Sequence, residues 1–280
     1  MFFGNANADV ITFTNGVTSI ASNTTIQGTV QTSGADIVIG TATLRGAVRL
    51  STGPGAGDIT VGAISGAGVT LDVDAGTGDI GLSNPANVIG NLTVSGDEVS
   101  VSEADDITQA AAWTTTGSMT LNAQGNDVLL TNPANRFGIL NAAGDVVKIV
   151  EDADTELGSF TVTSVFELTS AGSILDANGL VSNIIALTAT VSLTAVQDIG
   201  IAGAEILTSV AVDALEISAA TLTLQAGDDI AVHLQQTTVV QSLNGDLAFL
   251  SGTFDIDLSA AAAVLRGLSV LAPDGTITLP

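Results

Sequence analysis

Residues 84–90 read NPANVIG, and residues 132–138 read NPANRFG, so one seven-residue segment recurs 48 positions further along the chain. The match continues without a gap at the same offset: Leu92 with Leu140, Gly96-Asp97 with Gly144-Asp145, Val99 with Val147, Val101 with Ile149 and Glu103 with Glu151. Self-similarity of this length at one fixed offset indicates an internal structural repeat, and such periods are typical of solenoids, propellers and arrays.

A shorter pattern accompanies this repeat, in which a Gly, Asn or Asp turn leads into an alternating apolar pair. It recurs as Gly57-Asp58-Ile59, Gly78-Asp79-Ile80, Asp106-Ile107, Asp127-Val128 and Gly172-Ser173-Ile174. Alternation with period two over three to five residues, as in Leu71/Val73 and Val99/Val101, predicts short strands with one buried face. Strands this short bury that face when each stacks on its equivalent in the next coil of a solenoid.

The sequence therefore predicts an all-β fold, a right-handed parallel β-helix (β-solenoid) of roughly 11 to 13 irregular coils. The 48-residue unit then corresponds to two coils of ~24 residues. The handedness rests on the strong preference of parallel crossovers for the right hand. We expect one solenoid over residues 1–280, with the clearest repeats in residues 57–160.

Asparagine occupies repeated turn positions in this pattern, at Asn84 and Asn132 and again at Asn87 and Asn135. Asparagine side chains hydrogen-bond to nearby backbone in turns, and amide groups stack where identical positions lie above one another. We predict that these four residues form a structural turn ladder from coil to coil.

The composition excludes several classes of partner. The chain has 5 Lys+Arg against 29 Asp+Glu, a formal net charge of -24 and 0 Cys. A surface of this sign repels phosphate, so nucleic acids and anionic membranes are not expected as partners. Insertion into a membrane is not expected either, because no apolar run approaches the ~20 residues that a helix needs to span a bilayer. The first residues, MFFGN, show no export signal.

Three segments carry a family resemblance: DITQ at residues 106–109, WTTTGSMTLNA at 113–123 and DVLLTNPANRFG at 127–138. They resemble the repeat region of filamentous-haemagglutinin-like exoproteins, right-handed β-helical adhesins of Gram-negative bacteria, and related β-strand-repeat surface proteins. The resemblance implies a non-enzymatic adhesin or structural shaft that is secreted or exposed on a bacterial cell surface. Neither a two-partner-type secretion domain nor a translocator barrel is recognisable, so a passenger segment or a small self-assembling relative is expected.

The resemblance leaves the partner open. A glycan or protein on a host or neighbouring cell is one expectation, with attachment or biofilm contacts as the outcome. The alternative is the chain itself: exposed strand edges at the ends of a solenoid stack head to tail, which would make the chain a subunit of an extracellular filament or surface layer.

The best candidate for a cation site is the acidic run around residues 151–156. It would offer Glu151, Asp152, Asp154 and Glu156 as weak Ca²⁺ ligands, although it lacks the glycine rhythm of calcium-built β-rolls. Two Asp-x-Asp pairs, Asp72/Asp74 and Asp255/Asp257, are expected to face solvent because the apolar residue between them faces inward. No other cofactor is indicated.

An enzymatic function is not expected. Gly227-Asp228-Asp229 matches one of four elements of polygalacturonases, and the others are missing. The single histidine, His233, has no second histidine or cysteine to share a metal. Trp113 could serve as a platform for a sugar ring, with a core tryptophan as the other interpretation. A polysaccharide-active enzyme therefore stays the least favoured alternative.

Overall fold

The computed structural model describes residues 24–178, 183–197 and 199, together with the short strands at 10–12 and 18–20 and those after residue 214. Side chains are described for residues 24–178, 183–186, 189–197 and 199. The chain divides into two compact units, Met1–Gly138 (unit 1) and Ile139–Pro280 (unit 2). The division falls inside the region of clearest repeats, residues 57–160.

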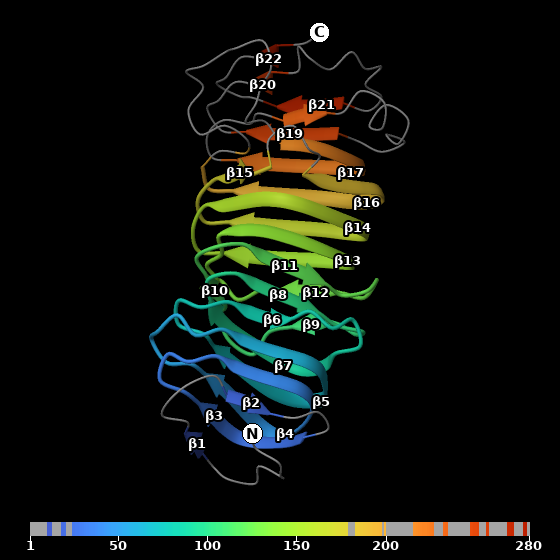
Figure 1. Cartoon of the computed structure of the whole chain (residues 1–280). Helices are drawn as coiled ribbons and strands as arrows, with labels where there is room; N and C mark the ends of the chain where they lie inside the picture. Colours follow the sequence, from blue (N-terminus) through green and yellow to red (C-terminus); the bar gives the residue numbers. More distant parts are fainter. Residues whose placement is uncertain are drawn as a thin grey trace. The chain divides into compact units, whose positions relative to one another are not determined.

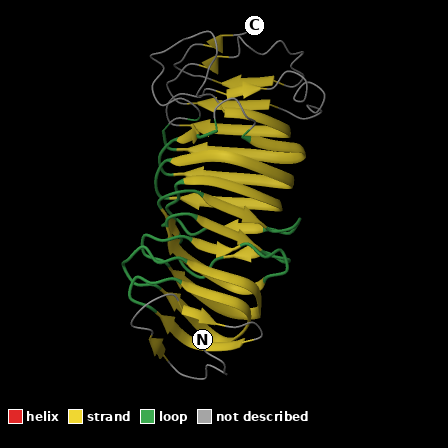
Figure 2. Ribbon diagram, in the orientation of Figure 1, coloured by secondary structure: helices red, strands yellow, loops and turns green. Residues whose placement is uncertain are grey.

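Strands dominate both units, and the described residues contain no helix (Figures 1 and 2). Unit 1 contains β1 (Val10–Thr12), β2 (Thr18–Ile20), β3 (Thr24–Gln31), β4 (Ile37–Ser51), β5 (Ile59–Asp74), β6 (Ile80–Leu82), β7 (Val88–Gly96), β8 (Val99–Ser102), β9 (Ile107–Thr108), β10 (Thr114–Thr115), β11 (Met119–Asn122) and β12 (Val128–Leu130).

Unit 2 contains β13 (Ile139–Glu151), β14 (Thr155–Ser170), β15 (Ile174–Asp176), β16 (Ile184–Ala195), β17 (Leu215–Ala226), β18 (Val232–Leu234), β19 (Leu247–Ser251), β20 (Ile256–Asp257), β21 (Leu268–Leu271) and β22 (Ile277–Thr278). Within the described part of the chain, no helix is long and apolar enough to cross a membrane.

The strand pairings among the described residues are parallel, and each joins a strand to its equivalent one coil later. In unit 1, Ile37 pairs with Ile59, and Ile59 in turn pairs with Ile80. In unit 2, Phe160 pairs with Ile184. Parallel stacking at this sequence separation defines a β-solenoid and confirms the predicted fold class.

The described structure holds about 8 coils, fewer than the 11 to 13 that the sequence predicted for all 280 residues. Coil length varies along unit 1. The hydrogen bonds that join Asp36, Asp58, Asp79 and Glu98 in turn span 22, 21 and 19 residues. These coils are shorter than the expected ~24 residues, which agrees with the irregular period seen in the sequence.

The core of each unit is an apolar interior built by the inward positions of the strands. In unit 1, β5 alternates buried and outward residues at each end, with Ile59, Val61, Leu71 and Val73 buried. Phe160 and Phe166 of β14 stack inside unit 2 with their ring centroids 4.7 Å apart. Stacking places like side chains above one another, so the interior is continuous from coil to coil.

Several strands are longer than the three to five residues that the alternation predicted. β4 spans 15 residues and β5 spans 16, and each bends where the register between them shifts, between Thr43 and Val48 of β4. Gly46 (φ +64°) and Gly68 (φ +72°) adopt left-handed backbone at these bends. Glycine turns the corner there without ending the strand, so one continuous strand covers two faces of the coil.

Candidate functional site

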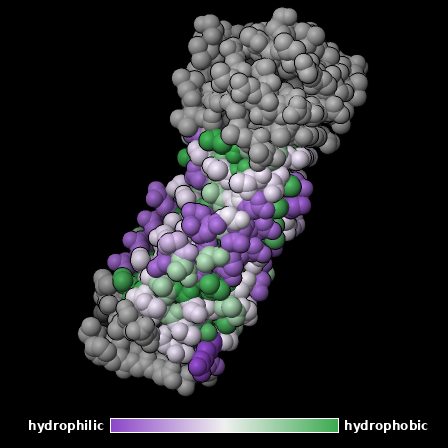
Figure 3. Space-filling view, turned by 90° about the vertical axis from the view of Figure 1, so that its right-hand side faces the viewer, coloured by the Kyte–Doolittle hydropathy of each residue, from purple (hydrophilic) through white to green (hydrophobic). Residues whose placement is uncertain are grey.

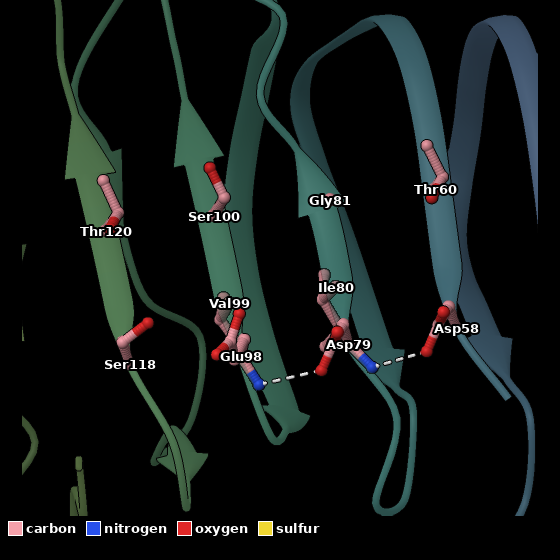
Figure 4. Close-up of a pocket in the computed structure, with 10 residues that line it drawn as sticks. All are labelled: Asp58, Thr60, Asp79, Ile80, Gly81, Glu98, Val99, Ser100, Ser118 and Thr120. Carbon is pink, nitrogen blue, oxygen red and sulfur yellow. Dashed lines mark hydrogen bonds between the residues drawn. The ribbon is translucent and has the colours of Figure 1, made fainter. Parts of the chain in front are cut away.

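A shallow groove of about 360 Å³ crosses four successive coils of unit 1 (Figure 4). It lies over β5, β6, β8 and β11, which pair in that order. Its lining consists of Asp58, Thr60, Asp79, Ile80, Gly81, Glu98, Val99, Ser100, Ser118 and Thr120. Ile80 and Val99 are buried, so the polar side chains form the accessible wall of the groove.

The polar side chains of the groove form two parallel rows, because the coils are in register. Thr60 pairs with Gly81, and Gly81 pairs with Ser100, which pairs with Thr120. These four positions form a row of small residues and hydroxyls. The second row lies two positions earlier on each coil, at the start of the strands, and carries the carboxylates.

The carboxylate row, which we call the axial acidic row, consists of Asp36, Asp58, Asp79 and Glu98. Each aspartate accepts a hydrogen bond from the backbone N–H of the next member. The distances from donor nitrogen to Oδ1 are 3.0 Å for Asp58 to Asp36, 3.0 Å for Asp79 to Asp58 and 3.2 Å for Glu98 to Asp79. These bonds link the starts of β5, β6 and β8 to the coil before each of them.

The same bond recurs elsewhere in both units. In unit 1, the N–H of Asp127 donates to Oδ1 of Asp106 at 3.1 Å. In unit 2, the N–H of Ser173 donates to Oδ1 of Asp154 at 2.8 Å, and the N–H of Ser159 donates to Oδ1 of Asn141 at 2.9 Å. The aspartate that directly precedes β4, β5, β6, β9 and β14 is therefore a structural acceptor, and Asn141, which lies within β13, accepts a bond of the same kind from β14.

The electrostatics of the groove are negative. Its lining carries three carboxylates and no basic side chain, and the sequence has no Lys, Arg or His between Arg49 and Arg136. The groove also lacks a histidine or a second kind of titratable group that would act as acid or base beside its hydroxyls. The arrangement accepts hydrogen bonds and attracts cations, and it offers no nucleophile with an activating partner.

The repeated Gly-Asp pairs at residues 96–97 and 144–145 also bond between coils. Oδ1 of Asp97 accepts a hydrogen bond from the hydroxyl of Thr116 at 2.5 Å. Oδ1 of Asp145 accepts hydrogen bonds from the hydroxyls of Ser164 and Thr163, which lower the pKa of the Asp145 carboxyl. The equivalent positions of the two units therefore make equivalent contacts with the following coil.

The four predicted turn asparagines form two local pairs: the backbone N–H of Asn87 donates to the carbonyl of Asn84 at 3.0 Å, and the N–H of Asn135 donates to the carbonyl of Asn132 at 3.2 Å. Asn84 and Asn132 accept the N–H of the residue two positions later, at 2.9 and 3.0 Å, which closes an Asx turn within each coil. Asn87 is fully buried; it accepts the N–H of Ile64 at 2.8 Å and donates to the carbonyl of Leu82 at 2.8 Å. These bonds are to backbone, within the coil and to the preceding coil.

Asn135 repeats the bonds of Asn87, with the N–H of Trp113 at 2.9 Å and the carbonyl of Leu130 at 3.0 Å. A glutamine lies between the two asparagine levels: Nε2 of Gln109 donates to Oδ1 of Asn135 at 2.8 Å, and Oε1 of Gln109 accepts the N–H of Asn132 at 2.8 Å. The 48-residue repeat spans two coils, so equivalent asparagines are too far apart to stack directly.

Trp113 is not a platform for a ligand. Its side chain is fully buried, and its indole N–H donates to the carbonyl of Leu92 at 2.8 Å. The ring is part of the core of unit 1, and the bond to Leu92 connects it to the neighbouring coil. The interpretation of Trp113 as a sugar-binding residue is therefore wrong, because no ring face is exposed.

The acidic run of residues 151–156 does not gather its carboxylates. Glu151 faces the interior and is 1% exposed, whereas Asp152, Asp154 and Glu156 are exposed. Strand alternation causes this separation, since Glu151 ends β13 on its inward side. Among the residues with described side chains, no group of three or more acidic, histidine or cysteine residues is arranged to hold a metal ion.

The Asp72/Asp74 pair faces outward and is bridged by a cation from the adjacent coil. Arg49 contacts Asp72 through one guanidinium nitrogen and Asp74 through the other, the second at 2.9 Å. Val73 between them is fully buried, as the alternation predicted. In unit 2, Lys148 pairs with Glu167 at 2.9 Å on neighbouring coils. Asp228, Asp229, Asp255 and the side chains of His233 and Asp257 lie outside the described residues.

Sequence reasoning missed the buried carboxyl group of Glu103 and its partly exposed neighbour Asp105. Glu103 is 1% exposed, and one oxygen of each side chain is buried without a hydrogen-bond partner. The sequence did indicate that Glu103 is buried, because the alternation that buries Val99 and Val101 continues to Glu103. The axial acidic row was likewise visible as a repeated turn, but its hydrogen bonds depend on which coils lie in register.

Comparison with known proteins supports the repeat architecture of unit 1. Residues 21–92 and 88–142 match the family model described as "Repeats of unknown function (DUF5649)". Neither the curated proteins nor the solved structures contain a significant match to the chain. The matched residues cover the axial acidic row, the groove and both Asn-Pro-Ala-Asn segments.

Proposed function

We propose that this chain is a non-enzymatic structural segment of a bacterial cell-surface or secreted protein, a shaft that mediates attachment through its outer faces. The observation that supports this proposal best is the coil-to-coil bonding among the described residues of each unit. Backbone pairing, the axial acidic row and the bonds of Asn87 and Asn135 all join one coil to the next. Such a scaffold resists local opening, which suits a protein that bears load or protease attack.

The outer faces support a role in contact rather than in catalysis. On the face that Figure 3 presents, hydrophilic residues alternate with small hydrophobic patches. The groove offers hydroxyls and carboxylates as hydrogen-bond acceptors along four coils. The ligand that fits this chemistry is a hydroxyl-rich glycan or a basic protein surface on a host or neighbouring cell.

A binding experiment tests the attachment function. Beads that carry the folded full chain are expected to adhere to cultured cells or to an immobilised glycan panel, and beads that carry the heat-unfolded chain are not. Asp58→Asn and Asp79→Asn together keep the coil-to-coil acceptors and remove two groove charges, so they should weaken binding to a basic partner selectively. Equal adhesion of folded and unfolded chains would exclude a role for the solenoid surface.

The second candidate is a self-assembling extracellular filament or surface-layer subunit. Parallel stacking within each unit supports it, because the same edge-to-edge bonds join separate molecules wherever strand edges are exposed. Size-exclusion chromatography and electron microscopy of the full chain distinguish the two candidates. Fibres whose length grows with protein concentration support the filament, and a monomer at all concentrations supports the shaft.

A further inference from the structure

The turn after β8 contains a carboxyl group in an environment without a cation. Glu103 continues the inward alternation of Val99 and Val101 and is 1% exposed. Its Oε2 accepts the N–H of Ile89 on the preceding coil at 3.0 Å. Its Oε1 is buried and has no hydrogen-bond partner. An ionised carboxylate in this position would leave one charged oxygen without solvent or a donor, which is costly.

Asp105 supplies the complementary group. Its Oδ1 is buried and also lacks a hydrogen-bond partner, while the rest of its side chain reaches the partly exposed surface of the turn. Asp105 lies close enough to raise the pKa of Glu103, through its negative charge and by favouring a protonated, hydrogen-bonding Glu103 side chain. An ionised carboxylate only accepts hydrogen bonds, whereas a protonated carboxyl group donates one. A single proton on Oε1 of Glu103, directed at Oδ1 of Asp105, would therefore satisfy both buried oxygens.

No basic residue on the adjoining coils replaces that proton. The preceding coil, residues 80–96, contains no titratable side chain, and the following coil, residues 118–135, contains only Asp127. The backbone N–H of Asp127 bonds to Asp106, the remaining acidic residue of the turn. Burial raises the pKa of Glu103 from 4.5 to about 9; the Ile89 hydrogen bond opposes this rise, and Asp105 adds to it.

We propose that Glu103 and Asp105 form a proton-binding site, which holds one proton between the two carboxyl groups at neutral pH and makes the folding of unit 1 depend on that proton. The site is a particular feature of unit 1. The repeat partner of Glu103 is Glu151, which is also 1% exposed, but Ala153 stands at the position equivalent to Asp105.

The stability of the folded chain should fall as pH rises, because the folded chain holds a proton that the unfolded chain releases. The unfolded chain releases the Glu103 proton near pH 4.5, and the folded chain keeps it until about pH 9. Between these limits, the unfolding equilibrium constant rises up to tenfold with each pH unit. The stability due to the proton is fully present below pH 4.5, declines through neutral pH and is lost above about pH 9.

Urea unfolding of the full chain from about pH 5.5 to about pH 8.5 tests the proposal. The unfolding constant of the wild type should rise by up to about 1,000-fold over these three units. Glu103→Gln, which is neutral and keeps a donor for Asp105, should show almost no rise. Glu98→Gln, at an exposed position of the same coil, should keep the wild-type slope. The same slope in wild type and Glu103→Gln would overturn the proposal.

Two further measurements keep the proposal testable if Glu103→Gln folds poorly. Asp105→Asn removes the neighbouring charge, so the pKa of Glu103 should fall and the decline in stability should end at a lower pH. An infrared band of a protonated carboxylic acid should be present in the wild type at neutral pH. A large loss of wild-type stability with EDTA at neutral pH would show that a divalent cation occupies the pair, and would overturn the proposal.

Discussion

At the scale of the residue, a few buried side chains satisfy backbone groups that the stacked strands leave unpaired. The fully buried side chain of Asn87 accepts a hydrogen bond from the N–H of Ile64 and donates one to the carbonyl of Leu82. Asn87→Ala leaves both groups without a partner, so we expect a loss of ~2–5 kcal/mol in the free energy of unfolding. Urea unfolding followed by circular dichroism measures this loss.

Asn84→Ala is the matched control, because Asn84 closes only a local turn and is partly exposed. It should cost about 0.5–1 kcal/mol. Equal losses in the two variants would contradict the assigned role of Asn87. The sequence indicated that both asparagines hydrogen-bond at turns, but it could not separate them, since burial at position 87 depends on the coil above and below.

At the scale of the element, the start of several strands is bonded to an acidic residue of the preceding coil. Asp79 accepts the N–H of Glu98, and its own N–H donates to Asp58. Asp79→Asn keeps the acceptor and removes a charge from a row of like charges, so its stability should equal or exceed that of the wild type. Asp79→Ala removes the acceptor and should cost about 0.5–1.5 kcal/mol in the free energy of unfolding.

Thermal unfolding of the two variants beside the wild type checks this prediction. If Asp79→Asn and Asp79→Ala lower the stability equally, then Asp79 stabilises the fold through its negative charge and not through its hydrogen-bond acceptor. Parallel strands could be predicted here from the recurring Gly-Asp-Ile turn and the period-two alternation. The long strands β4 and β5 could not be predicted, because glycine is common in turns and only the register shows that each strand continues through Gly46 or Gly68.

At the scale of the whole molecule, the coil architecture could be predicted from the sequence. Its cause is a pattern of inward apolar residues that recurs along the chain. The candidate sites were harder to predict from the sequence than the coil architecture. The run of residues 151–156 is dense in acid along the chain, yet alternation turns Glu151 inward and the others outward. Conversely, the environment of Glu103 depends on the adjoining coils, which bury its side chain beside Asp105.

The net charge of the chain leads to a last prediction, on how salt changes thermal stability, and the same experiment tests the calcium hypothesis. With a formal net charge of -24 and acidic rows in register, the folded state concentrates like charges that the unfolded chain spreads apart. Added salt screens this repulsion, so the midpoint of thermal unfolding should rise as NaCl increases from about 20 to about 200 mM.

CaCl₂ at matched ionic strength separates screening from specific binding. Since the described side chains bring no three acidic residues together at a metal site, CaCl₂ and NaCl should raise the midpoint by similar amounts, and EDTA should not lower it. A much larger rise with CaCl₂ that Asp152→Asn and Asp154→Asn abolish would instead assign a cation to residues 151–156. Similar rises in the two salts would instead assign the exposed carboxylates a role in mutual repulsion.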